Sequence, residues 1–317
     1  MSVTTLVLLL SGLGLLLLGG ELLVRGAVAV ATRLGVSRLL AGLVIVGFGT
    51  STPELMASLD AALSGAPGIA VGNVVGSNIA NLLLILGIAA LLFPVAVDAK
   101  AFHRDGIVLA LTTVIGVGVL MIGQLERPIG ALLIACIIAY VTVTYMLEKR
   151  RHTAAEKVYL EEAELKETPG LGLGPGLGLT VLGLGGVVVG ADWLVRGAVE
   201  VATTFGVSDA VIGLTLVAVG TSLPELATVV VAGLRKQSEI AIGNVIGSNI
   251  FNILFILGAT ALVHPIPVAP EIIAFDIWAM AAVTGLALFL IRTGWEVSRL
   301  EGVVLLSGYV IYLWIVF

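Results

Sequence analysis

The chain of 317 residues is 59% hydrophobic and only 12% charged, with a formal net charge of −5 and a mean hydropathy of +1.15. These values exclude an ordinary soluble domain and indicate an integral membrane protein. The apolar stretches are long enough to cross about 30 Å of hydrocarbon as helices, and they are too long for barrel strands. The single cysteine, Cys136, lies in an apolar run, which excludes a disulfide framework within the chain.

Hydropathy predicts ten membrane-spanning helices, joined mostly by short loops. The first has no basic residue before it and no cleavage site after it, so we expect a retained span and not a signal peptide. The spans are 3–24, 39–63, 69–92, 104–122, 128–147, 172–195, 209–233, 240–263, 272–292 and 298–316. A charged stretch separates the fifth span from the sixth. We therefore expect a five-helix domain at 1–147, a cytoplasmic linker at 148–170 and a second five-helix domain at 171–317.

The basic residues predict the orientation, because lysine and arginine are retained on the cytoplasmic side of a membrane. With ten spans, all but two of the 16 Lys and Arg residues fall on one side, and only Arg127 and Arg196 fall on the other. We expect a multi-pass protein of the cytoplasmic (inner) membrane, surrounded by the lipid bilayer. Both termini should face outward, with the charged linker inside.

The two halves of the chain are related by an internal repeat. A shift of 171 residues places GTSTPEL over GTSLPEL and GNVVGSNIANLLLILG over GNVIGSNIFNILFILG. Each half holds an odd number of spans, so the second copy must cross the membrane in the opposite sense. Inverted repeats of this kind are typical of secondary transporters, whose site lies at the midplane between the halves, on broken helices.

The GTSTPEL segment places polar groups in the middle of an apolar span. Pro53 has no amide proton, so the carbonyl of Gly49 loses its helical partner and the helix should break here. Such backbone is tolerated at membrane depth only where it is buried in protein or lines a cavity. Freed carbonyls, hydroxyls and the carboxylate of Glu54 suit a hard cation such as Ca²⁺ or Na⁺. A simple proline kink explains neither Glu54 nor its repetition as Glu225.

The following span carries a polar stripe. Asn73, Ser77 and Asn81 are spaced by four and share one helix face, and the helical rise places Ser77 level with Glu54. For Asn73 and its repeat partner Asn244, packing between helices is an equally good interpretation. The predicted ligands are the four stripe residues level with the glutamates, Ser77, Asn81, Ser248 and Asn252.

These motif pairs resemble the two α-repeats of the cation/Ca²⁺ antiporter superfamily, in particular its Na⁺/Ca²⁺ exchanger branch. The resemblance implies an all-α integral membrane protein of ten transmembrane helices, arranged as two inverted five-helix repeats. It implies Ca²⁺ bound by Glu54 and Glu225 with backbone oxygens of Thr50 and Thr221. It also implies Na⁺ sites and a central pair of amides, drawn from Ser51, Ser77, Ser222, Ser248, the carbonyls of Gly47 and Ala218, and Asn81 and Asn252.

The amide at Asn252 departs from some relatives, including K⁺-dependent exchangers, which carry aspartate there. The departure argues against K⁺ co-transport. It leaves two formal negative charges in the core, which match one Ca²⁺ and fall one short of three Na⁺.

We therefore expect an antiporter that exchanges Na⁺ for Ca²⁺ by alternating access and moves net charge. No enzymatic activity, cofactor, nucleic-acid partner or obligatory protein partner is expected. The nearest alternative is an H⁺/Ca²⁺ antiporter on the same scaffold, which a pH gradient in place of a Na⁺ gradient would reveal. A passive cation channel is a more distant alternative, and it would lack countertransport. An intramembrane protease is disfavoured because no histidine lies at the midplane to activate a serine.

Overall fold

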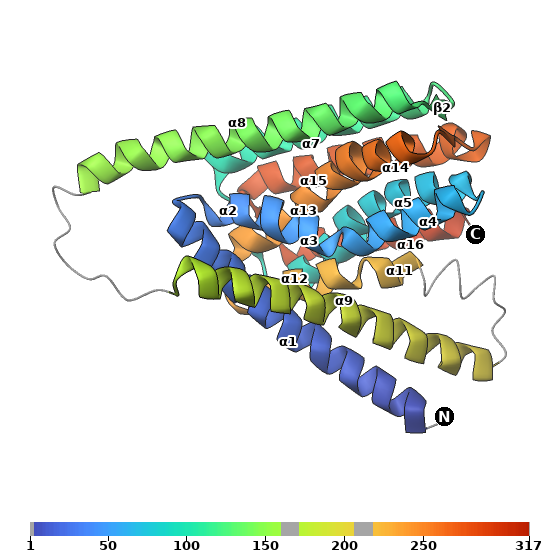
Figure 1. Cartoon of the computed structure of the whole chain (residues 1–317), viewed down its shortest axis with the longest axis horizontal. Helices are drawn as coiled ribbons and strands as arrows, with labels where there is room; N and C mark the ends of the chain where they lie inside the picture. Colours follow the sequence, from blue (N-terminus) through green and yellow to red (C-terminus); the bar gives the residue numbers. More distant parts are fainter. Residues whose placement is uncertain (1–2, 160–170, 206–217, 317) are drawn as a thin grey trace.

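The structure, a computed structural model, describes residues 3–159, 171–205 and 218–316, and most of them are helical (Figure 1). Segments labelled η are π-helical, with a wider turn than an α-helix. The first half contains α1 (Val3–Leu34), α2 (Arg38–Leu40), η1 (Ala41–Val46), α3 (Gly47–Thr50), α4 (Thr52–Leu63), α5 (Pro67–Ala80), η2 (Asn81–Ile85), α6 (Leu86–Leu92), β1 (Val95–Ala96), α7 (Ala99–Leu120), β2 (Gln124–Leu125) and α8 (Arg127–Tyr159). The second half contains α9 (Leu173–Thr204), α11 (Ala218–Thr221), α12 (Leu223–Leu234), α13 (Ser238–Phe251), η4 (Asn252–Ile256), α14 (Leu257–Val263), β3 (Ile266–Pro267), η5 (Ile272–Asp276), α15 (Ile277–Gly294), β4 (Glu296–Val297) and α16 (Arg299–Val316).

Eight helical segments within the described residues are long and apolar enough to cross a membrane. The bent pair Arg38–Thr50 and Thr52–Leu63 makes a ninth span if its two helices count as one. The one remaining predicted span, 209–233, is the seventh in chain order. It falls partly on 206–217, outside the described residues, and its described part is α11 and α12. A multi-pass, predominantly helical membrane protein is thereby confirmed.

The charged linker predicted at 148–170 begins inside a helix. The last helix of the first half, α8, is 33 residues long and continues to Tyr159. Residues 160–170 lie outside the described part of the chain. The first part of the predicted linker is therefore a helical extension of the fifth span.

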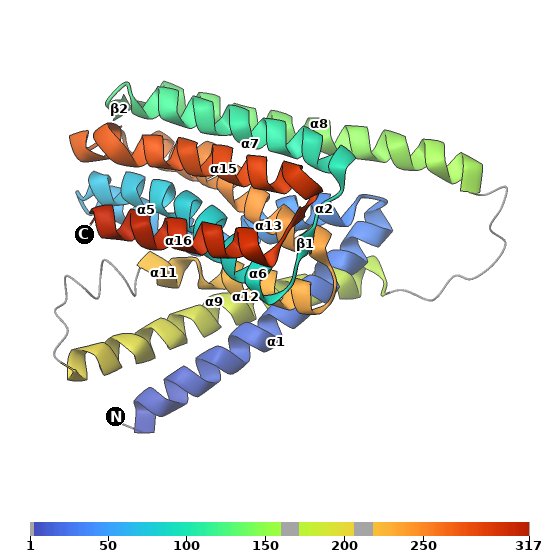
Figure 2. The same cartoon turned by 180° about the vertical axis from the view of Figure 1, so that it is seen from behind.

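The helices α1 and α9 cross at very short range. They run in opposite directions along the edge of the bundle that lies away from α7 and α8 (Figures 1 and 2). A Cβ atom on Gly183 would lie 2.3 Å from the backbone nitrogen of Leu23, and one on Gly19 would lie 2.6 Å from that of Val187. Glycines at these positions let the two backbones touch, as small residues do at membrane helix crossings.

The helix of the GTSTPEL segment breaks at Ser51, as Pro53 predicts. Ser51 has φ −81° and ψ 8°, and the helices on its two sides are bent by 40°. Ser222 adopts nearly the same angles, φ −91° and ψ 5°, before α12. Pro53 and Pro224 each lie in the first turn of the helix that follows, where a missing amide proton leaves no helical bond unmade. The same proline motif thus sets both breaks.

The two spans that carry the polar stripes form the centre of the molecule. In the first half α5, η2 and α6 are continuous, and in the second half α13, η4 and α14 are continuous. A π-helical segment begins at Asn81 in one span and at Asn252 in the other. Every residue of α13 from Ile240 to Phe251 is buried. The stripe of the second repeat is therefore shielded from the surroundings over its whole length.

Short strand pairs and tyrosine contacts tie the remaining helices together. The strand β1 pairs with β4 and β2 pairs with β3, both antiparallel, so the halves are joined at opposite ends of α7. The hydroxyl of Tyr140 in α8 donates to Asp105 in α7 at 3.1 Å. The hydroxyl of Tyr312 in α16 donates to Asp276 in η5 at 2.9 Å. Both repeats thus connect their last two spans by the same kind of bond.

Candidate cation site

The structure brings the two predicted carboxylates together between the helix breaks. Glu54 and Glu225 lie in the first turns of α4 and α12, where the helix dipole favours an anion, and their exposed fractions are 0% and 1%. The Oγ of Ser51 donates to Oε1 of Glu225 at 3.0 Å. Reciprocally, the Oγ of Ser222 donates to Oε1 of Glu54 at 3.2 Å. Each carboxylate is therefore held by the serine of the opposite repeat.

Several polar atoms at this centre are buried without a hydrogen-bond partner. They are Oε2 of Glu54, Oε2 of Glu225, and both Oδ1 and Nδ2 of Asn81 and of Asn252. Leaving such atoms unpaired is costly, so most buried polar groups in proteins are bonded. Unpaired oxygens on four predicted ligands make this centre the candidate cation site.

The side chains gathered at this centre carry the kind of ligand atom that hard cations prefer. Its donors are two carboxylates together with amides, hydroxyls and main-chain carbonyls, all oxygen ligands. Among the described residues, no group of three or more His, Cys, Asp or Glu is placed to hold a metal ion.

Gly47 and Ser248 also meet at the first break. The carbonyl of Gly47 accepts from the amide of Ser51 at 3.1 Å and from Oγ of Ser248 at 3.4 Å. A Cβ on Gly47 would lie 3.0 Å from the nitrogen of Ser248, so α3 packs closely on α13. The hydroxyl of Thr50, fully buried, lies 3.1 Å from the carbonyl of Val46. Three predicted ligands from both repeats thus share one place.

The remaining predicted ligands are less fully placed. Ser77 is buried on α5, one turn from both Asn73 and Asn81. Thr221 ends α11 and is half-buried, and Ala218 begins that helix. The amide of Ser222 donates to the carbonyl of Val219 at 3.1 Å, three residues back, whereas the amide of Ser51 reaches four residues back. The two breaks are therefore not identical in their hydrogen bonds.

Asn73 and Asn244 contact the two glutamates. From the sequence, these asparagines could equally have served only to pack the helices together. The Nδ2 of Asn73 donates to the carbonyl of Glu54 at 3.1 Å, and the Nδ2 of Asn244 donates to the carbonyl of Glu225 at 3.4 Å. Their place four residues before Ser77 and Ser248 was the signal for a shared helix face. The sequence did not show that this face meets the first turn of the helix bearing the carboxylate.

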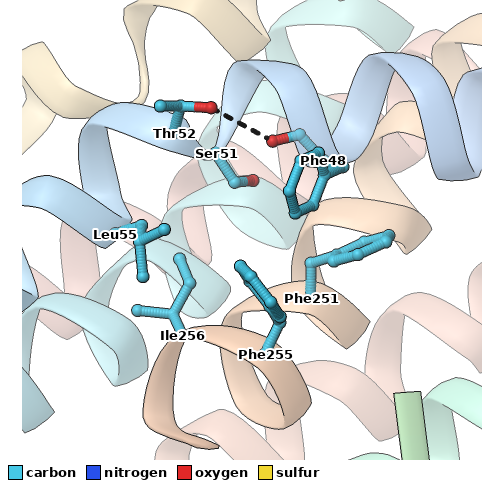
Figure 3. A pocket seen from close by; sticks show the side chains of 7 residues that line it. All are labelled: Phe48, Ser51, Thr52, Leu55, Phe251, Phe255 and Ile256. Atoms are coloured by element: carbon cyan, nitrogen blue, oxygen red, sulfur yellow. Dashed lines mark hydrogen bonds between the residues drawn. The ribbon is translucent and has the colours of Figure 1, made fainter. Parts of the chain in front are cut away.

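A small pocket lies beside the first break, on its apolar side (Figure 3). Phe48 contacts Phe251 and Phe255 with ring centroids 5.2 and 5.1 Å apart, and Ser51 lies at the edge of this group. The pocket has room for no more than about one water molecule and is partly open to the surface. Its lining is mostly hydrocarbon, namely Phe48, Ser51, Thr52, Leu55, Phe251, Phe255 and Ile256. Its lining contains no carboxylate, so the centre with Glu54 and Glu225 remains the candidate.

Broken helices in two inverted halves, with buried carboxylates between them, define a membrane transporter of the secondary class. The family model for the sodium/calcium exchanger protein matches residues 4–146 and again 175–317. The chain belongs to the sodium/calcium exchanger family, within the cation/Ca²⁺ antiporter superfamily.

Individual relatives are similar over nearly their whole lengths. The putative antiporter CaxA of Alkalimonas amylolytica is 37% identical over 314 residues, which cover 98% of each chain. The sodium/calcium exchanger MaX1 of Methanosarcina acetivorans is 36% identical over 98% of this chain and 97% of its own. In structure, the sodium-calcium exchanger NCX_Mj soaked with 10 mM Na⁺ and zero Ca²⁺ gives a TM-score of 0.83 at 32% identity, over 99% of each chain. The predicted ten-span fold of two inverted repeats is confirmed.

Proposed function

We propose that this protein exchanges Na⁺ for Ca²⁺ across the membrane by alternating access. The observation that carries the proposal is the reciprocal pair at the centre, in which Ser51 holds Glu225 and Ser222 holds Glu54. Both carboxylates keep a second oxygen that is buried and unpaired. Such oxygens are ready to bind a cation.

In this proposal the ions share overlapping ligands. Glu54 and Glu225 bind Ca²⁺ with backbone oxygens of Thr50 and Thr221. The Na⁺ sites and the centre use the remaining predicted ligands: Ser51, Ser77, Ser222, Ser248, the carbonyls of Gly47 and Ala218, and Asn81 and Asn252. Because Na⁺ and Ca²⁺ need the same carboxylates, binding of one displaces the other.

The same arrangement explains exchange without leak. Two buried carboxylates left empty and ionised repel each other and lack solvation, so an empty carrier resists the conformational switch. With three Na⁺ per Ca²⁺, one net charge crosses in each cycle. The membrane potential then contributes roughly 2.3 kcal/mol per 100 mV. We accordingly propose that transport is electrogenic.

The proposed orientation in the membrane is based on the positions of the basic residues. We propose that the protein lies in the cytoplasmic membrane, with both termini outside and residues 148–170 inside. These residues divide a first domain at 1–147 from a second domain at 171–317. The support is the distribution of basic residues, of which only Arg127 and Arg196 would face outward. Cysteine labelling of each terminus in intact cells tests this orientation, and termini that react only after lysis would contradict it.

Uptake of ⁴⁵Ca²⁺ into proteoliposomes tests the function. We expect an outward Na⁺ gradient to drive uptake, Glu54→Gln and Glu225→Gln to abolish it, and an imposed potential to change its rate. Asp60→Asn is the matched control, because Asp60 lies on the same helix α4 but is exposed. Uptake that follows a pH gradient and ignores Na⁺ would establish the H⁺/Ca²⁺ antiporter instead. Flux without countertransport would indicate a channel.

A further inference from the structure

Asn244 contacts three of the predicted ligands at once. Its side chain is fully buried on α13. Its Oδ1 lies 3.1 Å from the hydroxyl of Thr50 and 3.3 Å from the hydroxyl of Ser248, while its Nδ2 donates to the carbonyl of Glu225. Thr50 belongs to the first repeat and the other two belong to the second. One amide therefore connects the ligands of both repeats.

Asn73, the repeat partner of Asn244, is held differently. Its Nδ2 donates to the carbonyl of Glu54 and also to Oγ of Ser58 at 3.0 Å, and it is only half-buried. The second repeat has Val229 where the first has Ser58, so the bond from Asn73 to Ser58 has no counterpart at Asn244. Asn73 is anchored within its own repeat, whereas Asn244 bridges the two.

The chemistry of an amide explains why asparagine suits this place. The Nδ2 group can only donate and Oδ1 can only accept, so one side chain serves both a carbonyl and a hydroxyl. Aspartate would fit the space but would face the carbonyl of Glu225 with an acceptor, and an apolar side chain would leave that contact unmade. The bond to the carbonyl acts on the first turn of α12, which carries the carboxylate.

We propose that Asn244 is a positioning residue of the cation site, which fixes Glu225 relative to Thr50 across the boundary between the repeats. Asn73 fixes Glu54 in the same way but within one repeat. The Oδ1 of Asn244 lies within hydrogen-bond distance of the hydroxyls of Thr50 and Ser248, so the role that we assign to Asn244 is to hold these ligands in place. This inference rests on the proposed function, because it assumes that these residues hold Ca²⁺.

Equilibrium binding of ⁴⁵Ca²⁺ to the purified protein tests the inference, since it requires no Na⁺ coupling. For Asn244→Ala we expect about a tenfold higher Kd with the same number of sites, as loss of a buried hydrogen bond implies. Asn249→Ala is the matched control. Asn249 is also a buried asparagine of α13, and its Nδ2 donates to the carbonyl of Val245 on the same helix. Its Kd should equal that of the wild type.

A second variant covers the case in which Asn244→Ala does not fold. Thr50→Val removes the hydroxyl that faces Asn244 but keeps the backbone oxygen proposed as a ligand. Thr50→Val alone should raise Kd. If Asn244→Ala does fold, adding it to Thr50→Val should raise Kd by less than the two separate effects combined.

Three results overturn the inference. The first is an Asn244→Ala protein whose Kd stays at the wild-type value, whatever its number of sites. The second is a Thr50→Val protein with unchanged Kd. The third is a wild type that binds no Ca²⁺, which removes the proposed function as well. A wild type that binds Ca²⁺ but ignores Na⁺ would end only the proposed Na⁺ coupling, and the comparison of Kd values would still stand.

Discussion

The substitution Gly183→Ala tests the close crossing of α1 and α9. A Cβ at this position would lie 2.3 Å from the nitrogen of Leu23 and 2.7 Å from the carbonyl oxygen of Gly19. Both are backbone atoms, so no side chain can rotate away. Ordinary contact begins at 3.4 Å, and the two helices must therefore separate by about 1 Å at this point.

The energetic cost follows from the overpacking of a close interface. An added methyl group that forces backbone shifts costs about 1–3 kcal/mol. Each kcal/mol lowers Tm by about 2–4 °C in domains of about 150–250 residues, so we expect a loss of a few degrees for this longer chain. The effect should be visible in detergent, because the clash is between two helices of the same chain.

Thermal unfolding of the purified protein, followed by tryptophan fluorescence, measures the difference. Gly185→Ala is the matched control, since it lies two residues away on α9 and its Cβ would meet nothing within 4 Å. This control should be neutral or slightly stabilising, because alanine favours a helix by about 1 kcal/mol over glycine. Equal Tm values for the two variants would refute the reasoning.

Three further predictions concern charge. Acidification should inhibit Ca²⁺ uptake, because protonation of Glu54 or Glu225 removes a ligand charge. In a flux assay a higher Ca²⁺ concentration should restore the rate. Inhibition that Ca²⁺ does not relieve would contradict competition between protons and Ca²⁺. Asn252→Asp adds a third carboxylate to the centre and should shift this inhibition to higher pH, whereas a pH profile identical to that of the wild type would argue against Asn252 lying beside the ions. Arg235→Gln removes an ion pair with Glu21, in which the side chains of Arg235 and Glu21 are 42% and 23% exposed. The free energy of unfolding should fall by less than about 1 kcal/mol. A fall as large as that of Gly183→Ala would contradict this prediction.

The local features of the fold were predictable because they arise from single residues. The breaks at Ser51 and Ser222 follow from the covalent structure of Pro53 and Pro224, whatever surrounds them. The crossing of α1 and α9 left a signal in the sequence, since glycines recur every seven residues in both helices, as at Gly12, Gly19 and Gly26 and at Gly176, Gly183 and Gly190. The pattern marks a close-packing face but does not identify its partner helix. That partner depends on the tertiary arrangement.

The candidate site was predictable in its members but not in its contacts. The repeat indicated that Glu54 and Glu225 would meet, and the structure places them between the breaks. Their binding of ions stays a prediction. The sequence did not indicate that Ser51 donates to Glu225, because that bond depends on how the two repeats face each other. Nor does hydropathy indicate a π-helical segment beginning at Asn81, since a wider turn leaves the composition unchanged.

The reciprocal bonds between Ser51 and Glu225 and between Ser222 and Glu54 have a consequence for how such a protein can arise. A single five-helix unit contains an acid and a serine, yet the serine that donates to its acid belongs to another unit. A lone unit would regain both bonds only by pairing with a copy of itself inserted upside down in the same bilayer. When two such units are fused in one chain, they are always present in equal numbers and in opposite orientations. Each carboxylate then always has its serine donor.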